Sequence, residues 1–206
     1  MKKITYIFII TALLLGMLLH ACFKPEGILI DKESKDYCLF AEGSYWIYQD
    51  SATHIIDSVV IDKPISYSFG SEPKRDPYRE TYSTHISFYS QDSVSSILFD
   101  LTTGEADSDL KKPCLLRSYF FATMYHNGEV FEKFPNFKSL PVLVKKEDSY
   151  LINGITYLNV KIFEENMRVG KKRICYWAKN IGLIRTEIYK NDSVIVKNLI
   201  RYNVKQ

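Results

Sequence analysis

The chain has 206 residues, and its 27 Lys and Arg against 24 Asp and Glu give a formal net charge of +3. The basic residues are scattered rather than clustered, which argues against a nucleic-acid-binding groove. A hydrophobic fraction of 46% argues against a disordered chain, and the 15 Tyr and 12 Phe favour β-strands.

The first residues have the layout of a secretory signal. Lys2 and Lys3 precede an apolar run without charge over residues 4–19, and such a segment is excluded from fold reasoning. The run is somewhat short for a transmembrane helix, which needs about 20 apolar residues. An uncleaved membrane anchor is the alternative interpretation. Without the signal, the chain carries 25 basic and 24 acidic side chains.

The end of this segment, Leu19-His20-Ala21-Cys22, resembles a bacterial lipobox. An ordinary signal peptidase would need a small residue at the position of Leu19. The resemblance implies that Cys22 becomes the first mature residue and carries acyl chains, including palmitate. Each buried methylene contributes about 0.8 kcal/mol, so two or three chains form a lasting anchor. The alternative is that Cys22 is a buried or disulfide-bonded cysteine.

Three segments follow from this interpretation. Residues 1–21 form the lipoprotein signal peptide, and residues 22–36, which mix charge with Pro25 and Gly27, form a flexible tether. Residues 37–206 then form a single β domain, since this length suits one all-β unit.

The domain is predicted to be all-β. Alternation of apolar and polar residues is clearest in Arg79–Ser90, and Asn153-Gly154 and His126-Asn127-Gly128 are hairpin turn signals. Leu115–Tyr125 is assigned as a strand in preference to a short helix. The other predicted strands are Gly43–Gln49, Ile55–Ile61, Ser93–Leu101, Ser149–Ile152, Ile155–Glu164, Lys172–Lys179, Gly182–Tyr189 and Ser193–Val204.

Short turns between consecutive strands predict an antiparallel meander that forms a strongly curved sheet or open half barrel. In the last strand, strict alternation would place five apolar residues on one face. These are Val194, Val196, Ile200, Tyr202 and Val204.

Two stretches carry a resemblance to a family. "ICYWAKNIGLIRTEIY", residues 174–189, is similar to a "YWAKNVGLIR" signature of uncharacterised Bacteroidetes outer-membrane lipoproteins, and "GSYWIYQDSATHIIDSVVI", from Gly43, is similar to their opening. The resemblance implies an open antiparallel barrel, loosely like the lipoprotein carriers that shelter acyl chains in a concave sheet. Fold analogy does not supply function.

The aromatic residues of these stretches are the candidate ligand platform. Trp46 and Tyr48 lie near one end of the domain, and Tyr176 and Trp177 near the other. One interpretation is that they fill the core, because aromatics dominate core burial. The other is a platform that faces a sugar or a lipid.

The remaining cysteines are Cys38, Cys114 and Cys175. Disulfides are permitted outside the inner membrane. Cys38 and Cys114 fall at expected loop-to-strand boundaries and are predicted to pair. Cys175 falls inside a strand and is predicted to be a small buried hydrophobe.

The sequence carries no catalytic or cofactor motif. The mature histidines His54, His85 and His126 are far apart, so neither a metal site nor a cofactor is predicted. The acidic segment with Glu105, Asp107 and Asp109 is expected to be a solvated loop, since its spacing is not that of a calcium loop.

The first functional hypothesis is a lipid-anchored, non-enzymatic binding or structural module at the outer membrane. Its partners are the membrane, through Cys22, and a glycan, a lipid or an envelope protein, with no nucleic acid. The periplasmic and surface faces both stay open. The alternative is a hydrolase of envelope or dietary polysaccharide, which needs two carboxyl groups about 5 to 10 Å apart across a cleft.

Overall fold

The computed structural model describes residues 27–30, 32–72, 75–90, 93–103, 114–117, 142–167 and 171–206. Within them the chain forms one short helix and twelve strands. The elements are β1 (Gly27–Ile28), α2 (Lys32–Cys38), β2 (Tyr45–Asp50), β3 (Ile56–Ile61), β4 (Ser66–Glu72), β5 (Arg75–Ser90), β6 (Ser93–Thr103), β7 (Cys114–Arg117), β8 (Val142–Ile152), β9 (Ile155–Met167), β10 (Lys171–Ala178), β11 (Gly182–Lys190) and β12 (Ser193–Asn203).

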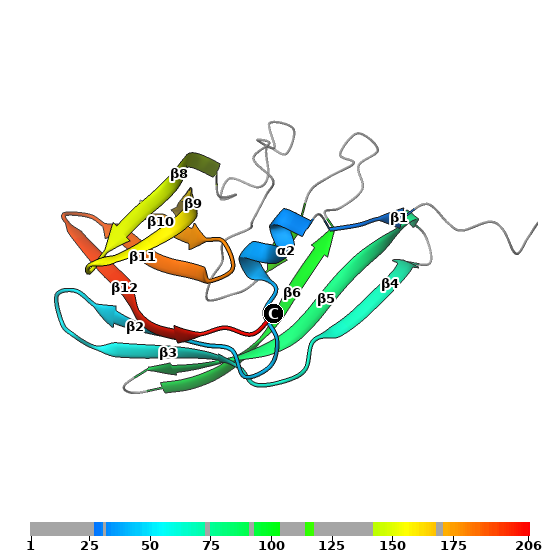
Figure 1. Cartoon of the computed structure of the whole chain (residues 1–206), viewed down its shortest axis with the longest axis horizontal. Coiled ribbons are helices and arrows are strands. Elements are labelled where there is room, and N and C mark those ends of the chain that lie inside the picture. Colours follow the sequence, from blue (N-terminus) through cyan, green and yellow to red (C-terminus); the bar gives the residue numbers. More distant parts are fainter. Residues whose placement is uncertain are drawn as a thin grey trace, which may run out of the picture.

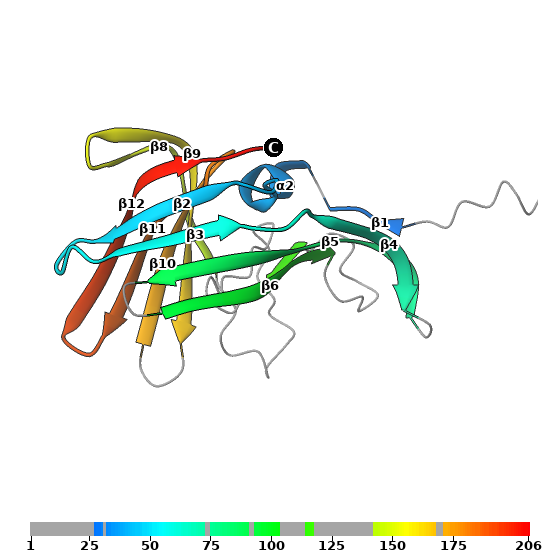
Figure 2. The same cartoon turned by 90° about the horizontal axis from the view of Figure 1, so that it is seen from below.

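The strands form one sheet in the order β7-β6-β5-β3-β2-β12-β11-β10-β9-β8, with β1 and β4 attached to β5 (Figures 1 and 2). Every pairing is antiparallel except that of β1 with β5. The last strand, β12, lies beside β2, so the two ends of the domain meet in the middle of the sheet. Between the described strands the sheet does not close, which confirms the predicted open all-β meander.

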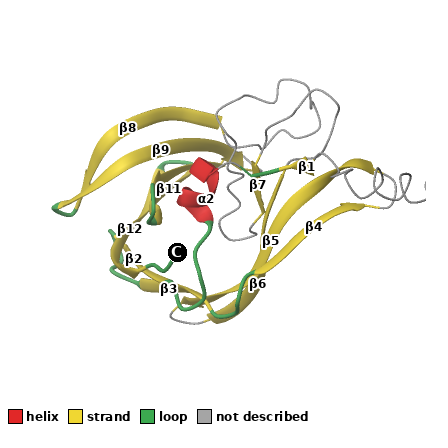
Figure 3. Cartoon of the chain, turned by 45° about the vertical axis from the view of Figure 1, so that its right-hand side comes forward, coloured by secondary structure: helices red, strands yellow, loops and turns green. Residues whose placement is uncertain are grey.

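The sheet bends strongly and surrounds α2 on its concave side (Figure 3). β-Bulges add local twist and bend the strand that contains them. Register shifts that mark such bulges occur between β4 and β5 at Gly70/Glu72, between β8 and β9 at Leu143/Lys145, between β10 and β11 at Tyr176/Trp177, and between β12 and β2 at Leu199/Arg201.

The predicted hairpin turn between β8 and β9 is confirmed. Asn153 and Gly154 have φ angles of 49° and 80°, as a two-residue turn with positive φ at both central positions requires. The other predicted turn, at residues 126–128, lies outside the described residues. For Leu115–Tyr125, the structure describes only the first part, which is in the strand β7.

The helix α2 was not anticipated. Residues 32–36 belong to it and to the folded domain, whereas the sequence predicts them to be part of a flexible tether. The helix buries one face, made of Ser34, Tyr37 and Cys38. A three- to four-residue spacing of buried positions is typical of a helix that packs on one side, and the concave sheet supplies the surface.

The bulge in β12 corrects another expectation. Because the register shifts between Leu199 and Arg201, alternation is interrupted there. Leu199 is buried in the core, and Ile200 is exposed. The five apolar residues predicted to share one face of this strand are therefore divided by the bulge.

Glu80 of β5 ties α2 to one half of the sheet. Its carboxylate accepts hydrogen bonds from the backbone N–H of Ile30 at 2.7 Å, from Lys35 Nζ at 2.8 Å and from Tyr82 Oη at 2.6 Å. The Glu80 side chain is only 5% exposed. Removing one partner of a buried ion pair leaves an uncompensated charge, so this contact strongly constrains the helix.

Other contacts tie α2 to the opposite half of the sheet. Tyr37 Oη donates to the carbonyl oxygen of Asn159 at 2.7 Å. The N–H of Asn180 donates to the carbonyl oxygen of Asp36, also at 2.7 Å, and Lys161 Nζ lies 2.8 Å from Glu33 Oε1. The helix thus bridges strands that lie on either side of the concavity.

We expect Glu80→Gln to weaken this bridge. Burial acts to raise the pKa of Glu80, but the bonds from Lys35, Tyr82 and the Ile30 N–H outweigh it, so the net pKa is lowered. A lowered folded-state pKa contributes stability above the unfolded value of about 4.3, and that stability is lost as pH falls further. Urea unfolding should show a loss of about 2 kcal/mol at pH 7, since bonds to charged groups contribute roughly that much.

The same measurement at pH 3 should show a smaller difference between Glu80→Gln and the unchanged chain. Glu42→Gln is the matched control because Glu42 is exposed, and it should change stability little at either pH. An equal loss for Glu80→Gln at both pH values would contradict the electrostatic role of the carboxylate.

Candidate functional site

Three of the four aromatic residues predicted as a ligand platform gather beside α2. Trp46 and Tyr48 come from alternate positions of β2, and Trp177 comes from β10. All three are buried, with exposed fractions of 6%, 5% and 4%. Their burial fits the interpretation that they fill the core. They can contact a ligand only inside the pocket that they line.

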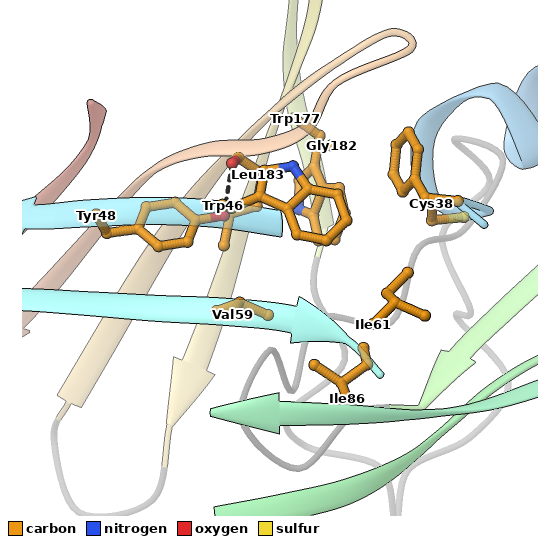
Figure 4. Close-up of a pocket in the computed structure, with 10 residues that line it drawn as sticks. Cys38, Trp46, Tyr48, Val59, Ile61, Ile86, Trp177, Gly182 and Leu183 are labelled. Atoms are coloured by element: carbon orange, nitrogen blue, oxygen red, sulfur yellow. Dashed lines mark hydrogen bonds between the residues drawn. The ribbon is translucent and has the colours of Figure 1, made fainter. Parts of the chain in front are cut away.

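The pocket lies between α2 and the concave face of the sheet (Figure 4). Its volume is about 40 Å³. It is lined by Cys38, Phe40, Trp46, Tyr48, Val59, Ile61, Ile86, Trp177, Gly182 and Leu183. These residues come from the end of α2 and from five strands, β2, β3, β5, β10 and β11, so the pocket exists only in the folded protein.

Three polar groups on the pocket wall, those of Trp46, Tyr48 and Cys38, are bonded to backbone carbonyls. Trp46 Nε1 donates to the carbonyl oxygen of Ile181, and Tyr48 Oη donates to that of Leu183 at 2.8 Å, a bond marked in Figure 4. Cys38 Sγ donates to the carbonyl oxygen of Ser34 at 2.9 Å. Burial raises the pKa of Tyr48 well above its usual range, so the phenol is neutral. The wall is therefore suited to an apolar group.

Gly182 shapes one side of the pocket. Its φ is +95°, and a Cβ placed there would lie 3.1 Å from Cε2 of Phe40. Phe40 in turn packs edge-on against Trp46, with ring centroids 5.2 Å apart. Glycine adopts a positive φ without steric penalty. The glycine of the "NIGLIR" stretch thus lets the aromatic wall approach the β10–β11 turn.

Tyr176, the fourth predicted residue, lies on the opposite face of β10 and does not join the pocket. It is 8% exposed, and its hydroxyl donates to Glu187 Oε1 at 3.1 Å. Glu187 also accepts from Arg185 Nε at 2.8 Å and from Tyr189 Oη at 2.7 Å. Arg185 Nη1 donates to Asn198 Oδ1 at 3.2 Å.

Charge and burial act together in this cluster. Burial, followed by the nearby charge of Glu187, raises the pKa of Tyr176. Burial also acts to raise the pKa of Glu187, but the bonds from Tyr189 and Arg185 outweigh it and the pKa is lowered. This cluster is not among the sites predicted from the sequence, although Arg185, Glu187 and Tyr189 alternate on one strand face. A charged carboxylate that accepts hydrogen bonds from several side chains is suited to stabilising the fold.

Two further buried carboxylates also face a cation. Asp57 forms a short ion pair with Lys197, and Glu165 accepts from Arg173 Nε at 2.9 Å. Burial raises the pKa of Glu165 despite the opposing effect of Arg173. The buried Asp57 Oδ1 has no hydrogen-bond partner. A hydrolase of the predicted kind needs two carboxyl groups across a cleft, whereas these carboxylates are paired with basic side chains.

The cysteines are placed as follows. Cys22 lies outside the described residues. Cys38 ends the helix α2, rather than lying at a loop-to-strand boundary, and is buried. The side chain of Cys114 lies outside the described residues, so its pairing with Cys38 stays a prediction. Cys175 is buried within β10, as the sequence predicts.

His54 lies in the β2–β3 turn and His85 within β5. His126 and the acidic segment of residues 105–109 lie outside the described part of the chain. In the described part, no three His, Cys, Asp or Glu side chains are grouped so that they could hold a metal ion. None of the helices in this part is long and apolar enough to cross a membrane.

No protein-family model and no curated protein matches the chain. Two solved structures are similar in shape. One is a candidate exported protein with a YmcC-like fold from Bacteroides fragilis, at 13% identity and a TM-score of 0.44, covering 81% of this chain and 100% of that one. The other is a candidate lipoprotein from Parabacteroides distasonis, at 13% identity and a TM-score of 0.45, covering 81% of this chain and 99% of that one.

We expect Gly182→Ala to disturb the pocket. An alanine there must adopt a left-handed conformation, which destabilises by roughly 1–2 kcal/mol, and its Cβ also presses on Phe40. Gly154→Ala is the control, because Gly154 has a φ of +80° with nothing within 4 Å of the added Cβ. Denaturant unfolding should show a larger loss for Gly182→Ala. Equal losses would mean that the contact with Phe40 is unimportant.

Proposed function

We propose that this chain is a lipid-anchored protein of the bacterial cell envelope, and that its curved sheet binds an apolar group without catalysing a reaction. The observation that carries the binding role is the pocket between α2 and the sheet, with its apolar and aromatic lining. The anchoring role is supported by the lipobox-like sequence that ends at Cys22. We place the anchor in the outer membrane.

The chemistry of the pocket favours an alkyl group over a sugar. A sugar needs many hydrogen-bond partners, and three of the few polar groups on this wall, those of Trp46, Tyr48 and Cys38, already donate to backbone carbonyls. A buried hydroxyl without a partner is unfavourable by about 1–3 kcal/mol. A methylene transferred from water gains about 0.8 kcal/mol.

The size of the pocket limits what enters it. One water molecule needs a cavity volume of about 10–15 Å³, and the volume of this pocket is about 40 Å³. It therefore suits a few carbon atoms at the end of a chain rather than a whole lipid. The contribution of this pocket to affinity is correspondingly about 2–3 kcal/mol, from roughly three methylenes.

The alternative, a polysaccharide hydrolase, receives less support from the described residues. Its general acid would be a carboxyl group without a fixed cationic partner, opposite a second carboxylate. Glu80, Glu165 and Glu187 each contact a lysine or an arginine instead. We infer that these ion pairs stabilise the fold, and this role accounts for the positions of the three carboxylates.

Lipid attachment is tested by metabolic labelling. Cells that express the chain and are fed radioactive palmitate should label the protein, and Cys22→Ala should abolish the label because the acceptor thiol is lost. Cys175→Ala is the control and should keep the label, since Cys175 is buried in β10. Labelling that persists in Cys22→Ala would contradict the anchor.

Ligand binding is tested by filling the pocket. Ile61→Phe adds volume to a residue that lines it, and Ile56→Phe makes the same change at an exposed position of the same strand, β3. A 16-carbon fatty acid with a fluorophore at its carboxyl end should bind the unchanged chain saturably. Ile61→Phe should weaken binding at least tenfold, and Ile56→Phe should not change it.

Circular dichroism of both variants checks that they fold. Equal affinity of the two folded variants, or no saturable binding by the unchanged chain, would overturn the apolar-ligand assignment. Saturable binding of an oligosaccharide that Ile61→Phe abolishes would replace it with a glycan role.

A further inference from the structure

The first described strand lies at one end of the molecule. β1 pairs in parallel with β5, with Gly27 opposite Tyr78 and Ile28 opposite Arg79. On the other edge of β5, Gly70 of β4 also lies opposite Arg79. Figures 1 and 2 show β1 and the end of the β4–β5 hairpin together, far from the β2–β3 turn.

The chain between Cys22 and β1 is short. Only residues 23–26 separate Cys22 from Gly27. Five residue steps span at most about 18 Å, even when fully extended. A lipid on Cys22 would therefore hold β1 within about 18 Å of the membrane surface. The neighbouring end of the β4–β5 hairpin is held at a similar height, because it shares a hydrogen-bonded register with β1.

Large apolar side chains are exposed at this same end. Leu29 is 64% exposed, Tyr67 56% and Phe69 38%. Tyr67 and Phe69 alternate along β4, so they share one face, and they lie opposite Tyr82 and Glu80 of β5. Leu29 directly follows β1, next to the position of Glu80. The three residues thus flank one segment of β5 from both sides.

We propose that Leu29, Tyr67 and Phe69 form a membrane-contact patch that rests in the lipid headgroup region. This inference rests on the proposed function, because it needs the lipid on Cys22. Aromatic rings with an apolar body are favoured at the boundary between water and hydrocarbon. The short connection to Cys22 brings the patch to that boundary, and burial of the patch removes its apolar surface from water.

The patch also fixes which side of the domain faces the membrane. Glu80 and Tyr82, opposite Phe69 and Tyr67, alternate along β5 with Ile86, which lines the apolar pocket. The patch and the pocket thus use the same face of this strand. The β11–β12 turn, with the exposed Val194, points away from the patch.

The test uses tryptophan fluorescence in the full lipid-bearing chain. Phe69→Trp and, separately, Tyr67→Trp place a reporter in the patch, and Val194→Trp places one at an exposed position of β12. The chain is reconstituted in vesicles of phosphatidylethanolamine and phosphatidylglycerol, with or without dibrominated phosphatidylcholine as the quencher. Trp46 and Trp177 are buried, so the unchanged chain gives the baseline.

The added emission of Phe69→Trp and Tyr67→Trp should fall at least twofold with the brominated lipid, whereas that of Val194→Trp should not change. Mass spectrometry of the reconstituted protein reports the lipid on Cys22 separately. No quenching of either patch reporter, with the lipid present, would overturn the patch and leave the anchor intact. Equal quenching of all three reporters would also overturn it, because the domain would have no fixed orientation. A chain without lipid on Cys22 would refute the proposed anchor itself.

Discussion

The buried carboxylate of Glu80 is the contact on which the architecture depends most. A curved sheet that does not close leaves its concave face open to water unless something fills it. Here α2 fills it, and Glu80 holds the chain on both sides of that helix's first turn, through the Ile30 N–H and Lys35. Contacts of Tyr37 and Asp36 with the β9 and β10–β11 segments hold the other side. The helix thus unites the two halves of the sheet around one core.

The same packing creates the candidate site. Where α2 ends, Cys38 and Phe40 meet the aromatic residues Trp46 and Trp177, and a small apolar pocket stays between them. Gly182 allows this approach because it has no side chain to obstruct Phe40. The opposite face of β10 has another character, since Tyr176 joins a charged network around Glu187. The adjacent residues Tyr176 and Trp177 therefore lie on opposite faces of β10.

Anchoring and binding are linked by geometry. The connection from Cys22 to β1 is so short that a lipidated chain would hold its β1–β4 end near the bilayer. Leu29, Tyr67 and Phe69 are exposed at that end. The pocket faces the same side of β5, so an alkyl group that leaves the membrane would approach the concave face rather than the outer one. The patch depends on the lipid at Cys22, whereas binding in the pocket depends on other residues and is tested separately.

Most of the strands and their order along the chain could be predicted from the sequence, whereas β1 and β4 were not predicted. Alternation in Arg79–Ser90 and the Asn153-Gly154 turn are local properties, because side-chain period and positive φ depend on near neighbours. The folded structure was needed to identify the helix α2, because its seven residues are too few for a clear periodic signal and its partner, Glu80, is distant in sequence. It also shows that Trp46, Tyr48 and Trp177 are buried around one pocket, whereas Tyr176 faces away from it. Bulges such as that at Leu199 shift the faces of a strand, and they arise from pairing between strands rather than from any single segment.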